Sequence, residues 1–320
     1  MHLIRSSILG LALAVGQLIP NLACAQDANT VRLVTPYPAG GPTDVVARVL
    51  AKPLSEELAR SVVVDNRSGA SGTIGAGHVA RSTPDANVLL INTSIQVILP
   101  HLTKLPYDTL TDFTPIGQVN TIPFILVINK NLPFKNLGEL IRYAKRNPGK
   151  LNYASNSSGS ASHLAAEQFK AIAGVSLVHI PYRGSAPAIT DLIGGQVQLM
   201  FEQGPSINAY LKSGQLKALA VTSVKRSGFA PDVPTFTEEG IPFVYTNWQG
   251  IWAPPGLPSA TTSRLTTALR NVMARPDVRQ RLTEMGTEPS TLAGDDFDAF
   301  VKQQYRVVGD IVRAANVKLD

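Results

Sequence analysis

Cysteine occurs only once in the 320 residues, at Cys24. One cysteine cannot form a disulfide within the chain, so stability has to come from a large buried core. The hydrophobic content of 44% is sufficient for such a core and is typical of a globular protein rather than a disordered one. A length of 320 residues predicts two domains.

Long hydrophobic runs are also missing after the first 25 residues. No later stretch approaches the roughly 20 apolar residues that span a bilayer, so we expect no transmembrane helix in the mature chain. Charge is sparse, because only 16% of the residues are Asp, Glu, Lys or Arg, and the formal net charge is +6. This modest positive excess suits small anions, but it forms no Lys/Arg stripe of the kind that binds nucleic acid.

The first 25 residues differ from the rest of the chain. Arg5 precedes an apolar run from Ile8 to Ile19, and Ala23-Cys24-Ala25 has the small residues that a signal peptidase recognises. We interpret residues 1–25 as a cleaved secretory signal, which predicts a periplasmic protein with a formal mature charge of +5. A lipoprotein anchored at Cys24 is the alternative, although Asn21 stands where that motif usually has leucine.

Motifs for metal binding and catalysis are missing too. The five histidines show no H-E-x-x-H or other zinc spacing, so neither a metal nor a cofactor is expected. A serine hydrolase of the α/β class would need G-x-S-x-G, which the chain lacks. Ser155 or Ser160 with His163 stays open as the nucleophile of an exported esterase, but these residues are too close in sequence for an oriented triad.

Short β-branched runs alternate with helical periodicity along the mature chain. A strand at Val31–Thr35 precedes an amphipathic helix that we expect to open at Asp44, with a kink or a restart at Pro53. The alternation predicts parallel sheets with helices on both faces. Two apolar strands, Phe124–Asn129 and Asn247–Pro254, cross between the halves, and two helices are expected after the second strand.

This order of elements predicts an α/β fold of two lobes. Two crossing strands would join the lobes and form a hinge beside a cleft. We place the first lobe at residues 26–123 and 250–320, and the second lobe at residues 124–249.

Three strand-to-helix corners contain the candidate binding residues. The first, PYPAGGPTD at 36–44, has two glycines that allow a close backbone approach just before a helix N-terminus, where N–H groups attract anions. From the residues alone it is equally a plain turn, with Asp44 as the helix cap. The second corner, SNSSGS at 155–160, repeats this logic with hydroxyl donors. The third contains Arg183, which could pair with a carboxylate or simply be exposed.

A glycine-rich stretch at Val62–Ala80 suggests a competing hypothesis. Its order of strand, loop and helix is typical of a dinucleotide site, but the glycines at 69, 72, 75 and 77 do not form G-x-G-x-x-G. No acidic residue follows at the spacing that binds a ribose. A dinucleotide-dependent enzyme stays open as a further alternative.

Six segments together resemble one protein family. The chain contains, in this order, PYPAGGPTDVVAR, VVVDNRSGASGTIGAGHVA, LPYDTLTDFTPIG, KLNYASNSSGSASHLAAE, HIPYRGSAPAITDLIGGQVQLMF and PDVPTFTEEGIP. They closely resemble the extracytoplasmic receptors of tripartite tricarboxylate transporters, also called Bug proteins, over essentially the whole mature chain. The resemblance implies a two-lobed periplasmic binding protein of the Venus-flytrap type. Such a receptor captures small organic carboxylates for a membrane permease and catalyses no reaction.

The resemblance also implies which residues bind the ligand. The first loop would hold a carboxylate through backbone N–H groups, with Asp44 behind the loop or reaching the ligand. The implied contacts are Tyr37, Pro38, Ala39, Gly40, Gly41, Asp44, Thr93, Ser94, Ser155, Ser158, Gly159, Ser160, Tyr182 and Gly184. Ser157 stands where relatives commonly have glycine, which predicts a different shape for the second loop. Whether Arg183 or Glu202 reaches the ligand is left open.

The leading hypothesis is a monomeric periplasmic receptor that closes two lobes over an organic anion and passes it to permease subunits. Neutral N–H donors suffice for this, because oriented dipoles in a water-poor cleft replace hydration. Closure requires only that the ligand bind the closed state better than the open one. An exported serine-dependent hydrolase of small esters is the alternative.

Overall fold

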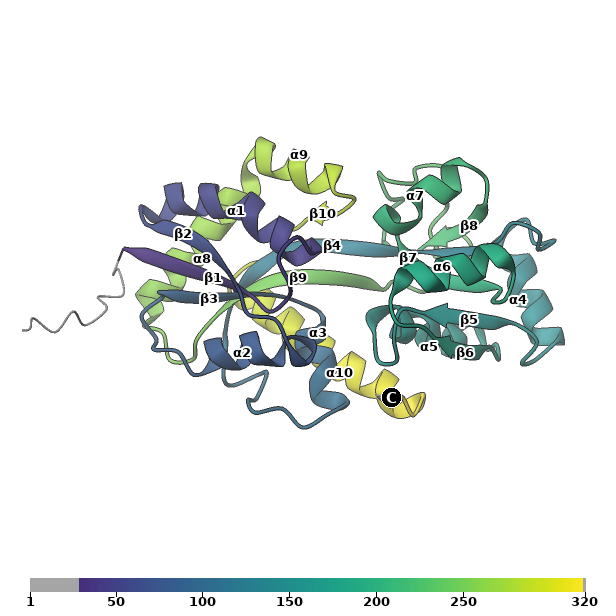
Figure 1. The fold of residues 1–320 in the computed structure, drawn as a ribbon, viewed down its shortest axis with the longest axis horizontal. Helices are drawn as coiled ribbons and strands as arrows, with labels where there is room; N and C mark the ends of the chain where they lie inside the picture. Colours follow the sequence, from purple (N-terminus) through teal and green to yellow (C-terminus); the bar gives the residue numbers. More distant parts are fainter. Residues whose placement is uncertain (1–28, 319–320) are drawn as a thin grey trace, which may run out of the picture.

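The computed structural model describes residues 29–318, which form two α/β lobes (Figure 1). The elements of the first lobe that precede the crossing are β1 (Thr30–Thr35), α1 (Pro42–Leu58), β2 (Ser61–Asn66), α2 (Thr73–Ala80), β3 (Val88–Thr93) and α3 (Ile95–Ile98), with 3-10 turns at Ala70–Gly72 and Leu99–His101. The elements that complete this lobe later in the chain are β9 (Thr246–Ala253), α8 (Ser259–Ala274), α9 (Pro276–Glu284), β10 (Glu288–Pro289) and α10 (Asp295–Ala314).

The second lobe is built from the middle of the chain. Its elements are α4 (Leu137–Arg146), β5 (Asn152–Ser155), α5 (Ala161–Ala173), β6 (Val178–Pro181), α6 (Ser185–Gly194), β7 (Leu199–Gln203), α7 (Gly204–Lys212) and β8 (Leu216–Val221). One long strand, β4 (Thr114–Asn129), runs through both lobes, and β9 returns beside it (Figure 1).

The strands follow the order β2-β1-β3-β9-β4-β7-β5-β6, and β10 and β8 also pair with β4. β1 is parallel to both β2 and β3, and β5 is parallel to both β6 and β7. β9 is antiparallel to β3 and β4, and β4 is antiparallel to β7 and β8. The expectation of parallel sheets is therefore confirmed for β1, β2 and β3 and for β5, β6 and β7, and it is wrong for the pairs made by β4 and β9. The chain enters and leaves the second lobe in opposite directions, so its two crossing strands are antiparallel.

The crossing strand β4 is longer than the sequence predicted. Its first part, Thr114–Pro123, pairs with β9, and its second part, Phe124–Asn129, pairs with β7 and β8. Only this second part reads as an apolar strand, because the first part contains two prolines, a glycine and polar residues. The partners of β4 change between Pro123 and Phe124, and the expected lobe boundaries stay a prediction.

Helices cover both faces of the sheet in each lobe. In the first lobe, α1, α8 and α9 share one apolar cluster with the strands, and α2, α3 and α10 share another. In the second lobe, α4 and α5 cover one face, and α6 and α7 cover the other. The apolar stripe of α8, which includes Leu265, Leu269 and Val272, is buried. Each fully buried leucine side chain contributes about 1.5–3 kcal/mol to folding.

Helix α1 begins at Pro42, not at Asp44 as expected. Proline suits the first helical position because its φ is already helical and it has no N–H to leave unpaired. The N-cap residue is Gly41, so Asp44 lies within the first turn and does not cap the helix. The expected restart at Pro53 does not occur, because α1 is one helix whose buried face continues from Leu50 to Leu58.

Three helices, not two, follow β9. Arg275 precedes Pro276 and is extended, with ψ of 130°, because a residue before proline is excluded from the helical region. This residue separates α8 from α9. The last helix, α10, extends from the first lobe toward the second and contacts α5 (Figure 1).

The predicted signal peptide, residues 1–25, lies outside the described residues. Within residues 29–318, no helix is both long and apolar enough to cross a bilayer.

Candidate functional site: an interlobe cavity

A cavity of about 630 Å³ lies between the two lobes. Loops that follow β1 and β3 form its wall in the first lobe, and loops that follow β5 and β7 form its wall in the second lobe. The crossing strands β4 and β9 complete it. The lining residues are Tyr37, Pro38, Gly41, Pro42, Thr43, Ser71, Thr93, Ser94, Ile95, Ile98, Leu99, Ile122, Phe124, Asn156, Ser157, Ser158, Gly159, Ser160, Ala161, Ser162, Ser185, Glu202, Gln203, Ser206, Asn247 and Gln249.

The cavity brings together predicted residues from both lobes. The predicted residues that line it are Tyr37, Pro38, Gly41, Thr93, Ser94, Ser158, Gly159 and Ser160. The predicted residues outside the lining are Ala39, Gly40, Asp44, Ser155, Tyr182 and Gly184. The first two corners predicted from the sequence therefore face each other, and the third contributes Ser185 instead of the predicted residues.

The first-lobe wall is the start of α1. The first turn of a helix leaves its N–H groups without intrahelical partners, and here that turn includes Thr43 at the cavity. The Thr43 hydroxyl accepts a hydrogen bond from Gln249 Nε2 at 3.2 Å, which ties the helix end to β9. The Gly41 N–H already donates to the Pro38 carbonyl at 3.3 Å. The N–H groups of this wall that can bind a ligand are therefore those in the first turn of α1, not those of Gly40 and Gly41.

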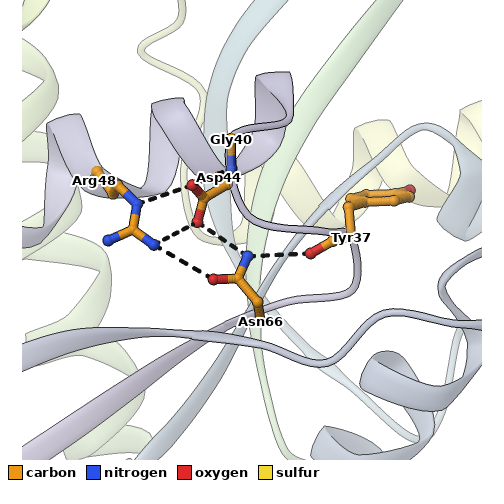
Figure 2. Close-up of polar contacts among 5 residues, drawn as sticks. All are labelled: Tyr37, Gly40, Asp44, Arg48 and Asn66. Atoms are coloured by element: carbon orange, nitrogen blue, oxygen red, sulfur yellow. Dashed lines mark hydrogen bonds and ion pairs between the residues drawn. The ribbon is translucent and has the colours of Figure 1, made fainter.

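Asp44 braces the loop from behind (Figure 2). Its carboxylate accepts hydrogen bonds from the Gly40 N–H at 2.9 Å, from Asn66 Nδ2 at 3.0 Å, and from Arg48 Nε and Nη2 at 2.8 and 3.0 Å. Asn66 also donates to the Tyr37 carbonyl at 3.1 Å. The hydrogen bonds from Arg48, with those from Gly40 and Asn66, lower the pKa of Asp44 to about 2. Asp44 is thus placed behind the loop, and the Gly40 N–H is engaged there.

Tyr37 closes the far end of the first loop. Its hydroxyl donates to Asn92 Oδ1 at 2.9 Å and lies 3.2 Å from Thr93 Oγ1. Burial raises the pKa of Tyr37 to about 12, so the phenol stays neutral at any physiological pH. The ring therefore lines the cavity while its polar atom is held by the end of β3.

The second-lobe wall is the start of α5. Ser160 caps this helix, because its hydroxyl accepts from the His163 N–H at 3.3 Å. The next two residues, Ala161 and Ser162, line the cavity within the first turn, where backbone N–H groups have no intrahelical partner. The Gly159 N–H donates to His163 Nδ1 at 3.1 Å, so His163 braces the start of its own helix.

Two of the predicted second-lobe residues, Tyr182 and Gly184, serve the framework instead. The Tyr182 hydroxyl donates to Asp191 Oδ2 at 2.7 Å, and burial together with this carboxylate raises the pKa of Tyr182 to about 12. Gly184, at a φ of 107°, precedes α6 and donates its N–H to the Asn156 carbonyl. Arg183 is exposed and does not line the cavity.

Ser155 is fully buried at the end of β5 and hydrogen-bonds to His179 Nε2 at 2.7 Å. This serine–histidine pair resembles a nucleophile and its base, but no substrate can reach a serine with no exposed surface. The pair instead ties β5 to β6. The geometry thus gives no support to the hydrolase alternative.

The glycines of the Val62–Ala80 stretch have a packing role. A side chain at Gly75 would place its Cβ 2.8 Å from the Arg67 carbonyl and 2.9 Å from Pro36 Cα, so only glycine fits against the first loop. This close approach explains the glycine without a phosphate. Ser71 of the same stretch does reach the cavity.

Several lining residues were missed by sequence reasoning. Ser185 and Ser206 each sit in the first turn of a helix that follows a strand, so the rule that found the first two corners applied to them as well. Asn247 and Gln249 belong to β9, and only the pairing of the two lobes reveals that they face the cavity. Asn247 Oδ1 accepts a hydrogen bond from the Ser94 hydroxyl at 2.7 Å.

The cavity contains many hydrogen-bond donors and little charge. Among the described lining residues, Glu202 is the only acidic residue, and no Lys, Arg or His is present. Burial raises the pKa of Glu202, against a smaller lowering by Ser185, the Gln203 N–H and Ser206. Within residues 29–318, no three His, Cys, Asp or Glu side chains are grouped so that they could hold a metal ion.

Two α/β lobes around one cavity, joined by two crossing strands, define a solute-binding protein of the periplasmic type. Residues 46–317 match the model of the tripartite tricarboxylate transporter family receptor. The chain is 35% identical to protein BugT of Bordetella pertussis over 318 residues, which covers 98% of each chain. The chain therefore belongs to the family of tripartite tricarboxylate transporter receptors.

Solved structures of relatives have the same fold. The periplasmic binding protein BugD is 39% identical, with a TM-score of 0.71 over 90% of this chain and 98% of that chain. Rpa4515 of R. palustris, solved with adipate, is 34% identical, with a TM-score of 0.75 over 90% of this chain and 98% of that chain. The two-lobed fold and the receptor function predicted from the sequence are thus confirmed, and the comparisons do not support a hydrolase.

Proposed function

We propose that this receptor captures a small organic carboxylate in the interlobe cavity and delivers it to the permease of a tripartite carrier. The observation that carries the proposal is that the N-termini of α1 and α5, from opposite lobes, line the same cavity. Helix N-termini attract negative charge through unpaired N–H groups and the helix dipole. The relative solved with adipate, a dicarboxylate, supports the same ligand class.

Backbone and hydroxyl donors would hold the carboxylate without a cationic side chain. A hydrogen bond to a charged group contributes about 1.5–3 kcal/mol, so two such bonds are worth about 3–6 kcal/mol before the cost of ordering the ligand. Thr43, Ala161 and Ser162 are placed to donate from the two walls. The lobes would close because a ligand held by both walls binds the closed state better than the open one.

A thermal unfolding screen of residues 26–320 against mono-, di- and tricarboxylates tests the proposal. A ligand at about 100 times its Kd should stabilise the protein by about 2.7 kcal/mol. The carboxamide analogue of each hit is the matched control, because it keeps the shape and removes the charge. NMR of the incubated ligand should show no turnover. The proposal is wrong if no organic anion raises the unfolding temperature, or if the carboxamides bind as tightly as the carboxylates.

We also propose that the protein acts in the periplasm, as a monomer, without catalysis and after cleavage of residues 1–25. The lobes would comprise residues 26–123 with 250–320, and residues 124–249, joined by the crossing strands. N-terminal sequencing of the exported protein should begin at Gln26. An acylated N-terminus at Cys24 would instead support the lipoprotein alternative.

A further inference from the structure

Glu202 is the one acidic residue among the described residues that line the cavity. It lies near the end of β7, opposite Ile125 of β4, and is only 2% exposed. Its Oε1 accepts a hydrogen bond from the Gln203 N–H at 2.8 Å. Its Oε2 is buried and has no hydrogen-bond partner within residues 29–318. An acceptor at the cavity is thus left unsatisfied.

An unpaired buried acceptor is costly, and more so if it is charged. No Lys, Arg or His among the described lining residues can compensate a charge on Glu202. Hydrogen bonding from Ser185, the Gln203 N–H and Ser206 lowers the pKa of Glu202, but burial raises it by more. A ligand that enters the cavity can supply the hydrogen-bond partner that Oε2 lacks within residues 29–318.

The two helix ends present donors to the cavity, because Thr43, Ala161 and Ser162 lie in first helical turns. A ligand that suits both parts needs an acceptor for the helix ends and a donor for Glu202. A dicarboxylate would bring a second negative charge into a cavity that already contains a carboxyl group. A molecule with one carboxylate and one protonated amine has both required groups and adds no net charge.

Building on the proposed function, we propose that Glu202 is a ligand-binding residue that pairs with a protonated amine, and that this receptor binds amino carboxylates in preference to their amine-free counterparts. The carboxylate of the ligand contacts the helix ends of α1 and α5. The ammonium group donates to Oε2 of Glu202, and the ion pair is shielded from water when the lobes close.

Calorimetric titration of the mature chain with matched ligands tests this assignment. The pairs are aspartate with succinate, glutamate with glutarate, and 5-aminopentanoate with pentanoate, and malate replaces the amine of aspartate by a hydroxyl. In the wild type, at least one amine should bind about 10- to 100-fold tighter than its partner, as expected for a hydrogen bond between charged groups. In Glu202→Gln, this preference should fall below about threefold, while the affinity for the dicarboxylates stays equal or rises.

Glu57→Gln is the matched control, because Glu57 is exposed on α1 and its carboxylate contacts only the Asn271 side chain by hydrogen bond among the described residues. It should leave all affinities unchanged. If Glu202→Gln keeps the preference for amines, or weakens every ligand equally while lowering the unfolding temperature, Glu202 merely supports the start of α7 and the assignment is wrong. It is equally wrong if the wild type prefers malate or succinate to aspartate and shows no preference for amines in the other two pairs. Failure of all carboxylates to bind would instead refute the proposed function.

Discussion

Replacing Asp44 tests whether the first loop is held from behind. The Asp44 side chain is 2% exposed, whereas the Arg48 side chain paired with it is 56% exposed. Bonds to an exposed guanidinium are screened by solvent and contribute little, about 0–1 kcal/mol. The two remaining bonds, from the Gly40 N–H and Asn66 Nδ2, end on a charged and buried acceptor.

The expected loss follows from those two bonds. Asp44→Ala removes the acceptor of the Gly40 N–H and of one of the two Asn66 Nδ2 hydrogens, which should lower the free energy of unfolding by about 2–4 kcal/mol. Asp44→Asn keeps one acceptor oxygen and should cost about 1–3 kcal/mol. Urea unfolding followed by the fluorescence of the buried Trp248 and Trp252 reports on the same lobe.

The loss of unfolding free energy in Asp44→Asn should also depend on pH. The pKa of Asp44 is lowered from 3.8 to about 2, so its ionised form stabilises the folded state. This stabilisation is complete above 3.8 and is lost as the pH falls toward 2. The difference between wild type and Asp44→Asn should shrink over that interval.

Asp298 is the matched control for Asp44. It also lies in the first turn of a helix and pairs with a residue four positions on, Lys302, but both side chains are more than one third exposed. Asp298→Asn should change the free energy of unfolding by less than about 0.5 kcal/mol. If Asp44→Asn unfolds at the same urea concentration as Asp298→Asn, the account of the loop is refuted.

Three other substitutions test the site and its support. Gly41→Val should abolish carboxylate binding, because its Cβ would lie 3.2 Å from the Pro38 carbonyl and its methyl groups would fill the cavity wall. The circular dichroism should stay unchanged, and retained affinity would place the site elsewhere. Ser160→Ala should cost about 1 kcal/mol in urea unfolding through loss of the α5 cap, and no change would contradict that role. Gly250→Ala should cost about 1–3 kcal/mol in the same assay, because its methyl group would overlap the Phe297 ring.

Local rules predicted the elements whose signals are local. Helix α4, Leu137–Arg146, is such an element, because both of its ends are marked in the sequence. Asn136 accepts from the Glu139 N–H at the start, and Lys145 and Arg146 face the negative end of the helix dipole. The first part of β4 was missed because its pairing with β9 comes from residues more than a hundred positions away, with two shifts of register.

The candidate site also has parts with a local sequence signal and parts that depend on distant residues. The corners at Gly41 and Ser160 were predicted, because glycine, serine and a helix start are visible in the sequence. Which N–H groups are spare could not be predicted, since the Gly40 N–H is engaged only because Asp44 turns back toward it. The environment of Glu202 was equally hidden, because α6 and α7 meet beside it only in the folded lobe.

The antiparallel pairing of β4 with β9 has a consequence for how the chain could be divided. Pro123 and Thr246 are direct partners at the end of this pairing, so the chain leaves and re-enters the first lobe at neighbouring points. The whole second lobe is therefore, in topological terms, one continuous insertion into a hairpin. A two-residue turn could connect neighbouring antiparallel strands there, which would leave β4 and β9 joined as a simple hairpin. The surface of α10 that contacts α5 would then become exposed.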